Sequence, residues 1–221
     1  MSEVFDCGEI DPRAAGLRAA GLAVRRGELV VMPTDTVYGI AADAFSPTAV
    51  QALLDAKGRG RDSPPPVLIP NTATLEALAA ELPDPVRRLA ERFWPGPLTI
   101  VLLANPSLSW DLGETGGTVA LRIPADPLAL DLLAVTGPLA VSSANLTGEP
   151  AATTAVGARE MLAESVAVYL EAGVVVGGGT SSTIIDGTRL TSDGGTLRIL
   201  RAGGVTREDL QTLLPEVTIE D

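Results

Sequence analysis

Short apolar runs alternate with amphipathic segments along most of the chain. The apolar runs predict strands at residues 28–32, 66–69, 98–103, 118–123, 138–141, 166–170, 174–176, 182–185 and 197–200. Between them apolar residues recur at helical spacing, which predicts helices at residues 11–26, 46–57, 71–81, 84–94, 126–135, 153–163 and 206–214. This alternation is typical of an α/β fold. The strands that cluster late in the chain favour a twisted mixed β-sheet flanked by helices over a purely parallel one.

The ends of the predicted helices carry capping signals. Four helices begin with Asp-Pro or Ser-Pro, as at Ser46-Pro47, where serine suits the N-cap and proline the first helical position. Thr206 and Asp209 have the spacing of a capping box before the last helix, and the acidic tail behind that helix is expected to fray. No internal repeat, low-complexity segment or linker interrupts the pattern, so we expect a single domain over residues 1–221 with its core at about 11–214.

Residues 30–62 combine several features of a ligand site. An apolar strand breaks at Pro33 into a hydroxyl-rich loop, residues 34–39, and the chain then enters a helix. That helix ends at residues 57–61 (KGRGR), where two glycines break it and three cations crowd together. Lysine supplies a point charge and arginine a fork that matches phosphate or carboxylate, so the two loops suit a small anionic ligand such as a nucleotide. The alternative is a solvated helix end whose cations favour the helix dipole.

Other polar residues occupy positions where either a ligand or the protein itself can be the partner. Thr34, Thr36 and Tyr38 follow a strand end, the place where α/β folds bind ligands, although threonine hydroxyls in turns also bond the local backbone. Arg122 lies inside an apolar strand and needs a partner. That partner is either an acidic side chain in a structural bridge, which is the commoner case, or a ligand carboxylate.

Two later segments are further candidates. Ser143 and Asn145 follow a strand end without a Gly-x-Ser-x-Gly pattern, which favours an Asx-turn, or polar contacts to a nucleotide or amino acid, over a serine hydrolase. Residues 177–183 (GGGTSST) suit either a phosphate cradle built from backbone amides or a plain hairpin turn, and they do not match the P-loop pattern.

The residue inventory limits the chemistry. The chain has no histidine, which excludes an imidazole base, a serine–histidine pair and a histidine-ligated zinc site. A single cysteine, Cys7, excludes an intramolecular disulfide and a thiolate metal cluster. Catalysis would therefore rest on carboxylates, cations, hydroxyls, backbone amides or a metal carried by the substrate. Reactions on nucleotide phosphates suit this inventory, because positioning and charge neutralisation dominate them.

Composition and charge narrow the class of protein. Apolar residues make up 46% of the chain and charged residues 20%, as in an ordinary globular protein. No apolar run approaches the roughly 18 residues of a membrane span. The acidic N-terminus lacks the features of a signal peptide, so we expect a cytoplasmic protein without a membrane partner. The net charge of −12 weighs against direct binding of tRNA, which normally needs a basic face.

Three motifs together resemble one enzyme family. They are PTDTVYG at residues 33–39, Lys-x-Arg at Lys57 and Arg59, and Ser-x-Asn at Ser143 and Asn145, in this order and at the expected intervals. The chain thus resembles the L-threonylcarbamoyladenylate synthases, the YrdC-like domain, over about residues 27–203. The resemblance implies condensation of L-threonine, bicarbonate or CO2, and ATP into threonylcarbamoyl-AMP with release of pyrophosphate. It also implies a partner transferase that uses this product to make N6-threonylcarbamoyladenosine in tRNA.

The resemblance also implies site residues. Lys57 and Arg59 would be catalytic and neutralise phosphate charge, and Mg2+ would arrive with ATP without metal ligands from the protein. The ATP-binding set would be Arg59, Ser63, Thr118, Asn145, Thr153 and Arg201. The threonine-binding set would be Thr36, Arg122, Ser143 and Ser182.

The chain departs from the family pattern at three positions. Many members carry histidine at the position of Leu68, asparagine at that of Ser63 and glutamate at that of Ser181, and all three differences bear on the threonine pocket. Two alternative functions remain at this stage. One is a related domain that forms a different carbamoyl adenylate, and the other is a non-catalytic RNA-binding module. Amino-acid-dependent release of pyrophosphate would indicate an enzyme, and salt-sensitive RNA binding without turnover would indicate the module.

Overall fold

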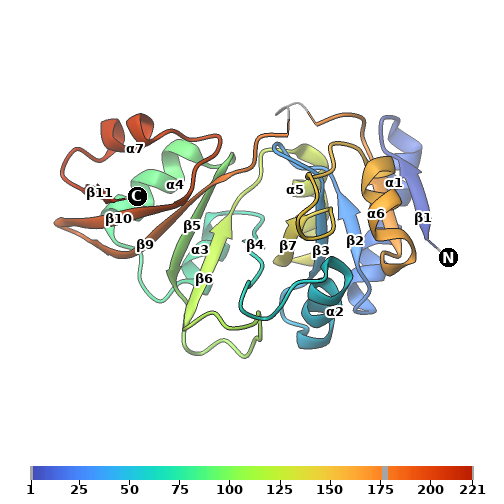
Figure 1. Ribbon diagram of the computed structural model, residues 1–221, viewed down its shortest axis with the longest axis horizontal. Helices are drawn as coiled ribbons and strands as arrows, with labels where there is room; N and C mark the ends of the chain where they lie inside the picture. Colours follow the sequence, from blue (N-terminus) through green and yellow to red (C-terminus); the bar gives the residue numbers. More distant parts are fainter. Residues whose placement is uncertain (1, 176–178, 221) are drawn as a thin grey trace.

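The computed structural model describes residues 2–175 and 179–220, and its strands form one continuous sheet (Figure 1). The strands are β1 (Glu3–Asp6), β2 (Val30–Met32), β3 (Gly39–Asp43), β4 (Val67–Leu68), β5 (Leu98–Leu103), β6 (Thr118–Arg122), β7 (Leu139–Ser143), β8 (Val168–Glu171), β9 (Thr183–Thr191), β10 (Gly194–Arg201) and β11 (Thr218–Glu220). Their order is β1-β8-β2-β3-β7-β4-β6-β5-β9-β10-β11. Parallel pairs such as β5–β9 coexist with antiparallel pairs such as β3–β7. The predicted mixed α/β sheet in a single domain is therefore confirmed.

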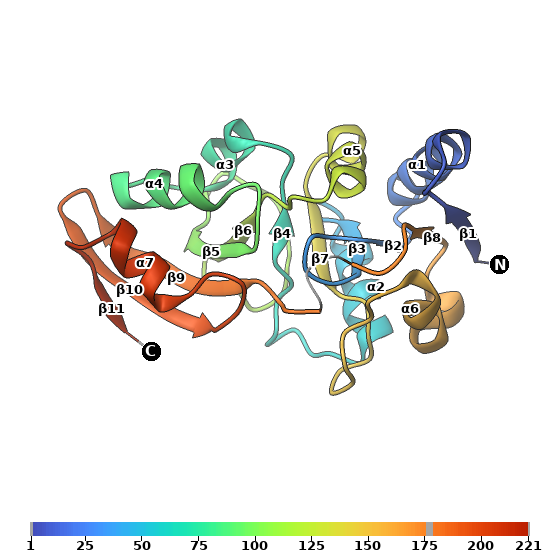
Figure 2. The same cartoon turned by 90° about the horizontal axis from the view of Figure 1, so that it is seen from above.

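Helices cover both faces of this sheet, but not evenly. They are α1 (Ile10–Arg25), α2 (Pro47–Lys57), α3 (Thr72–Leu78), α4 (Asp84–Phe93), α5 (Pro127–Thr136), α6 (Ala155–Leu162) and α7 (Arg207–Leu213), with a 3-10 turn at Ala163–Ser165. Figure 2 shows α1, α3, α4 and α5 along one side of the sheet and α2 and α6 on the other. In the described residues no helix is long and apolar enough to cross a membrane.

Some of the predicted helix caps form as expected, whereas α1 and α4 begin after Glu9 and Pro83 without a side-chain cap. Ser46 accepts a hydrogen bond from the amide of Ala49, and Asp126 accepts from the first amides of α5. Thr206 and Asp209 make the reciprocal bonds of a capping box. Each cap satisfies amide groups that the first helical turn leaves without a partner, which explains why a short local pattern was enough to place these helices.

Three strands were not predicted. The segment after the hydroxyl-rich loop does not lead straight into α2 but forms β3, whose small residues pair with β2 and β7. Strand β1 pairs with β8, and β11 pairs with β10, so the expectation of a frayed C-terminal tail is wrong for the described residues. Both edge strands lie outside the predicted core of about residues 11–214 and are short, and of their residues only Ile219 is buried.

Two predicted strands also have different bounds. Strand β9 continues to Thr191 and β10 begins at Gly194, because the two pair as a long antiparallel hairpin whose outer half is polar. Val174 and Val175 lie outside the strands of the structure, and residue 176 of that predicted strand lies outside the described residues.

The pleat of the central strands separates the core from a polar face. Leu98, Ile100 and Leu102 of β5 join the core cluster with α4, whereas Thr99 and Val101 line a cavity on the opposite face. Successive side chains of a strand point to opposite faces, so one strand serves both purposes. No helix covers this part of the second face in Figure 2, because α2 and α6 lie over β3 and β8. The cavity lies on the part of this face that α2 and α6 leave uncovered.

A close backbone crossing fixes one wall of that cavity. Residues 201–205 pass directly over Ser182 and Thr183: the Thr183 hydroxyl donates to the Val205 carbonyl at 2.6 Å, and Arg201 donates to the Ser182 carbonyl. A Cβ atom at Gly203 would lie 2.5 Å from the Ser182 carbonyl carbon and the Thr183 nitrogen. Only glycine fits at this crossing.

We expect Gly203→Ala to lower the free energy of unfolding by about 1–3 kcal/mol, because backbone must move to admit the methyl group. Gly157→Ala is the matched control, because its Cβ would meet only the Thr154 hydroxyl at 3.4 Å within α6. There alanine should be neutral or stabilise by up to about 1 kcal/mol. Urea denaturation of both variants checks this. Equal free energies of unfolding would contradict the claim that the crossing excludes a side chain at Gly203.

Candidate functional site

The cavity has a volume of about 470 Å³ and a cationic lining. Eight of the residues predicted to form the site line it: Thr36, Arg59, Ser63, Thr118, Arg122, Ser143, Ser182 and Arg201. They lie on β6, β7 and β10 or in the loops before β3, β4 and β9, in segments far apart in the sequence. The described lining contains three arginines and no aspartate or glutamate, in a chain whose net charge is −12. A site of this kind favours an anionic ligand.

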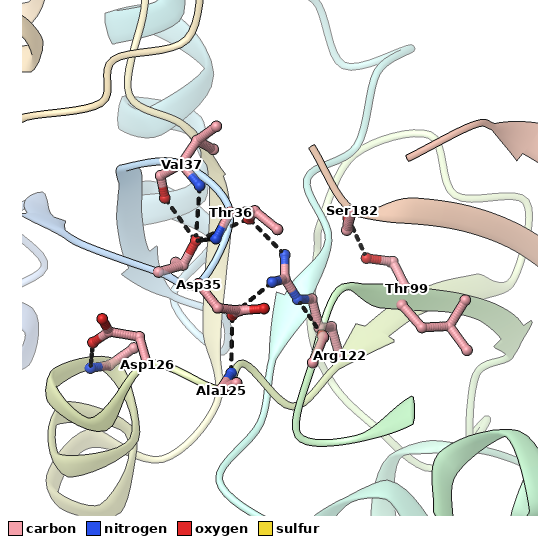
Figure 3. Close-up of polar contacts among 12 residues, drawn as sticks. Asp35, Thr36, Val37, Thr99, Arg122, Ala125, Asp126 and Ser182 are labelled. Carbon is pink, nitrogen blue, oxygen red and sulfur yellow. Dashed lines mark hydrogen bonds and ion pairs between the residues drawn. The ribbon is translucent and has the colours of Figure 1, made fainter. Parts of the chain in front are cut away.

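Arg122 is held in place on all sides of its guanidinium (Figure 3). Nε donates to the Gly96 carbonyl at 2.9 Å, Nη1 to the Thr36 hydroxyl at 3.1 Å and Nη2 to the Asp35 carboxylate at 2.7 Å. The residue is only 5% exposed, and burial lowers the pKa of the guanidinium while Asp35 opposes that shift. The structural bridge, the commoner of the two alternatives, therefore exists. Two of the five N–H donors remain without a partner among these contacts, and the side chain lines the cavity.

The hydroxyl-rich loop behaves partly as an ordinary turn. The Thr34 hydroxyl donates to the Val37 carbonyl at 2.6 Å and accepts from the amides of Thr36 and Val37 at 3.2 Å. Tyr38 is buried beneath the loop, where its hydroxyl contacts Glu171 at 3.0 Å. The Thr36 hydroxyl instead meets Arg122, so Thr36 is the residue of this loop that belongs to the arginine cluster.

Ser182 and Arg201 form the opposite wall. Arg201 donates to the Ser182 hydroxyl at 2.9 Å, and that hydroxyl also lies 2.9 Å from the Thr99 hydroxyl. Burial lowers the pKa of Arg201, and the positive charges of Arg122 and Arg59 lower it further. The three arginines thus repel one another across the cavity, and a bound anion would relieve that repulsion.

Lys57 has a different environment from the arginines. It is 1% exposed and does not line the cavity. Its ammonium donates to the Ser143 carbonyl, to the Asn145 carbonyl at 2.7 Å and to the Asn145 side chain at 3.5 Å. These acceptors match the three donors of an ammonium group. Lys57 therefore fixes the loop after β7, and its direct contact with phosphate stays a prediction.

The two arginines after α2 also differ from each other. Arg59 lines the cavity and lies 3.4 Å from the Ser142 hydroxyl. Arg61 is exposed and forms an ion pair with Asp111 at 2.6 Å. Of the two, only Arg59 is placed to meet a ligand in the cavity.

Two predicted ATP-binding residues do not line the cavity. Asn145 is buried, and its amide donates to the carbonyls of Leu146 and Glu149, so its side chain shapes the loop. Thr153 lies just before α6, where its carbonyl accepts from Val175. Of the suggested phosphate cradle at residues 177–183, positions 177 and 178 lie outside the described residues.

Sequence reasoning missed several polar residues of the site, among them Asp35, Thr99 and Ser142. Asp35 lies within the first motif but was not assigned, although its oxygen accepts from both Arg122 and the Ala125 amide. Thr99 and Ser142 line the cavity beside Ser182 and Arg59. The single hydroxyl residue within the otherwise apolar strand β5 was the available signal for Thr99.

The chain is similar to proteins of one family. The model Sua5_yciO_yrdC, described as telomere recombination, matches residues 22–203. A Mycobacterium leprae protein, provisionally named threonylcarbamoyl-AMP synthase, is 53% identical over 93% of this chain and 91% of its own length. The threonylcarbamoyl-AMP synthase of Bacillus subtilis is 37% identical over 95% of this chain and 59% of its own length. The structure of P. abyssi Sua5 complexed with L-threonine matches with a TM-score of 0.90 and 34% identity, over 99% of this chain and 63% of that one.

We expect the Lys57 ammonium to titrate near pH 8, because burial and, to a smaller extent, the Arg59 charge lower its pKa from 10.5 to about 8. Lys57 is the sole lysine in the sequence, so 13C-lysine labelling yields one Cε resonance whose pH dependence gives this value directly.

The lowered pKa of Lys57 links the stability of the fold to pH. The unfolded chain binds more protons than the folded one between about pH 8 and 10.5, so this group makes folding more favourable as pH rises through that window. A midpoint near 10.5 in the folded protein would contradict the burial of this side chain.

Proposed function

Because the chain belongs to the Sua5/YciO/YrdC family, we propose that it is a threonylcarbamoyl-AMP synthase, an enzyme that makes threonylcarbamoyl-AMP and pyrophosphate from L-threonine, bicarbonate or CO2, and ATP. The observation that supports this most directly is the convergence of Arg59, Arg122 and Arg201 on one cavity with hydroxyl groups between them. A nucleoside triphosphate and an amino acid carboxylate are both anionic, and guanidinium groups bind both in a bidentate manner.

The charges within the cavity divide it into two halves. Asp35 neutralises Arg122, so that side of the cavity suits a zwitterionic amino acid. In the described residues neither Arg59 nor Arg201 has a carboxylate partner, so their side suits the polyanionic triphosphate. We assign threonine to Thr36, Arg122, Ser143 and Ser182. The nucleotide falls to Arg59, Ser63, Thr118 and Arg201, with Asn145 and Thr153 shaping its surroundings.

The reaction needs positioning more than a nucleophilic side chain. The threonine amine would attack CO2 to give a carbamate, whose oxygen then attacks the α-phosphate while pyrophosphate leaves. Arg59 would neutralise charge that develops on the phosphate, and Lys57 would keep Ser143 in place by holding its carbonyl. Preorganised donors of this kind lower the barrier by stabilising charge in the transition state. The proposed reaction class is nucleotidyl transfer.

A Mg2+ ion would arrive with ATP. In the described residues no group of three or more acidic, histidine or cysteine side chains gathers to hold a metal. Magnesium in nucleotide sites is commonly bound by substrate phosphates and water, and it neutralises phosphate charge. The chain's contribution would be the arginines around the phosphates. A separate tRNA-modifying transferase would take up the product.

We expect pyrophosphate release to require both L-threonine and bicarbonate, with L-serine a poorer substrate. The measurement is a coupled pyrophosphate assay with each component omitted in turn. Equal release without any amino acid would contradict the proposed function.

We expect Arg59→Ala to lower kcat/KM more than Arg61→Ala. Loss of one charge-assisted contact costs about 1.5–3 kcal/mol, or roughly ten- to a hundredfold in rate. Arg61 is half exposed and paired with Asp111, so it serves as the matched control. Its replacement should cost no more than a surface ion pair contributes, which is below about 1 kcal/mol. Equal losses would mean that the cluster acts only as diffuse charge.

A further inference from the structure

The sheet consists of two halves that are joined by the shortest of its described strands. Strands β1, β8, β2, β3 and β7 lie on one side of β4, and β6, β5, β9, β10 and β11 lie on the other. Strand β4 itself has only two residues. The cavity lies across this junction, because its lining includes Ser143 of β7 as well as Thr118 of β6. Contacts that join the halves beside β4 therefore help to set the width of the cavity.

The segment between β5 and β6, residues 104–117, makes such a contact, and we call it the β5–β6 loop (Figure 1). It is anchored first on its own half of the sheet. The Asn105 amide donates to the Leu78 carbonyl at 2.8 Å, and the Asn105 side chain donates to the Ala77 carbonyl at 3.0 Å. Further along, Leu112 is 3% exposed and lines the cavity. The β5–β6 loop is thus a fixed part of the cavity wall.

Beyond this anchor, the β5–β6 loop contacts the other half of the sheet on both sides of α2. The Glu114 amide donates to the Arg61 carbonyl at 2.8 Å, after the end of that helix. Gly113 has a φ of +108°, and a Cβ atom there would lie 2.7 Å from the same carbonyl oxygen. Before the helix, Phe45 stacks on Trp110, with ring centroids 5.5 Å apart. The loop and the ends of α2 are therefore held together by close backbone packing and an aromatic pair.

These contacts bear on Arg59, which lies two residues before the docked carbonyl and lines the cavity. The positive charges of Arg59 and Arg201 repel each other, so without a ligand Arg59 is driven away from the cavity. The ion pair between the Arg61 side chain and Asp111 is 43% exposed on both sides and opposes that motion only weakly. The Arg61 carbonyl, which the β5–β6 loop holds, is part of the backbone and remains when the side chain is removed.

We propose that the β5–β6 loop holds Arg59 at the place where it meets the triphosphate, and that Gly113 and Trp110 are the positioning residues through which it does so. This inference rests on the proposed function for the identity of the nucleotide. Neither residue is among the described residues that line the cavity, so both would act on the ligand only through Arg59. Arg122 is held separately by Asp35 and the Gly96 carbonyl, so binding of the amino acid should not depend on this loop.

A pair of glycine variants tests the backbone contact. Gly113→Ala should weaken ATP binding about tenfold, because the methyl group pushes the loop off the Arg61 carbonyl and Arg59 is displaced with it. The Kd for L-threonine should change less than about twofold. Gly116→Ala is the matched control, because Gly116 lies in the same loop and also has a positive φ, +60°, but its Cβ would meet nothing within 4 Å. Calorimetric titration of ATP and of L-threonine should give Kd values for this control within about twofold of the wild type.

A second pair of variants tests the aromatic contact. Trp110→Ala removes the stack on Phe45 and should weaken ATP binding about threefold to tenfold, the range that an aromatic pair contributes. Trp110→Phe keeps a ring at this place and should restore the wild-type Kd. A loss of ATP affinity in Trp110→Phe as large as that in Trp110→Ala would contradict the role of the stack.

A double-mutant cycle decides whether the loop acts through Arg59. In an Arg59→Ala background, Gly113→Ala should weaken ATP binding by less than about a further twofold, because the group that the loop positions is gone. The full tenfold loss in that background would overturn the inference, because Gly113 would then act on the nucleotide independently of Arg59.

The remaining outcomes separate the inference from the proposed function. Equal losses of ATP and L-threonine affinity in Gly113→Ala, or an equal loss in Gly116→Ala, would overturn the role of the loop. Thermal unfolding identifies any variant that fails to fold, and the two Trp110 variants then decide alone. A wild type that binds ATP but releases no pyrophosphate with any amino acid would overturn the proposed function only. A wild type that binds no ATP would overturn both.

Discussion

The buried guanidinium of Arg122 is the constraint on which the rest of the site depends. It joins β6 to the hydroxyl-rich loop through Asp35 and Thr36, and to the turn before β5 through the Gly96 carbonyl. A charge that is 5% exposed is tolerable only when its hydrogen bonds are made and an opposite charge is near. Loss of one partner would leave an uncompensated buried ion. Moving any of the three segments away from Arg122 is therefore energetically unfavourable.

The cavity is locally cationic although the chain as a whole is acidic. The chain carries −12, yet its described cavity lining has three cations and no acid, and only Arg122 has a carboxylate partner there. A sum over the whole sequence cannot reveal this, because most acidic residues are dispersed on the exposed surface. The local field, not the net charge, decides which ligand enters. An enzyme for small anionic substrates is compatible with an acidic protein.

The sequence predicted what local physics determines and missed what distant pairing determines. The caps at Ser46, Asp126 and Thr206 formed because a helix start is specified within four residues. Strand β3 was missed because Gly-Ile-Ala-Ala-Asp has little strand propensity and is ordered by β2 and β7 on either side. Within the site, the alternation around Arg122 marked a buried cation. Its partner Asp35, 87 residues earlier, could be found only from the fold.

The contrast between Lys57 and Arg59 gives a physical reason for the Lys-x-Arg pattern. The loop after β7 presents three oxygens that converge on one point, and a compact ammonium can donate to all of them. A planar guanidinium at that place would direct its donors outward in a fork and would need a larger space than a group that is 1% exposed has. Two residues later the requirement is different, because Arg59 lines an open cavity, where a planar guanidinium can present its donors to an anionic ligand. Gly58, in the left-handed conformation that ends α2, turns the chain between the two environments. The order lysine, glycine, arginine thus follows from an inward-facing position, a helix end and a cavity-facing position in succession.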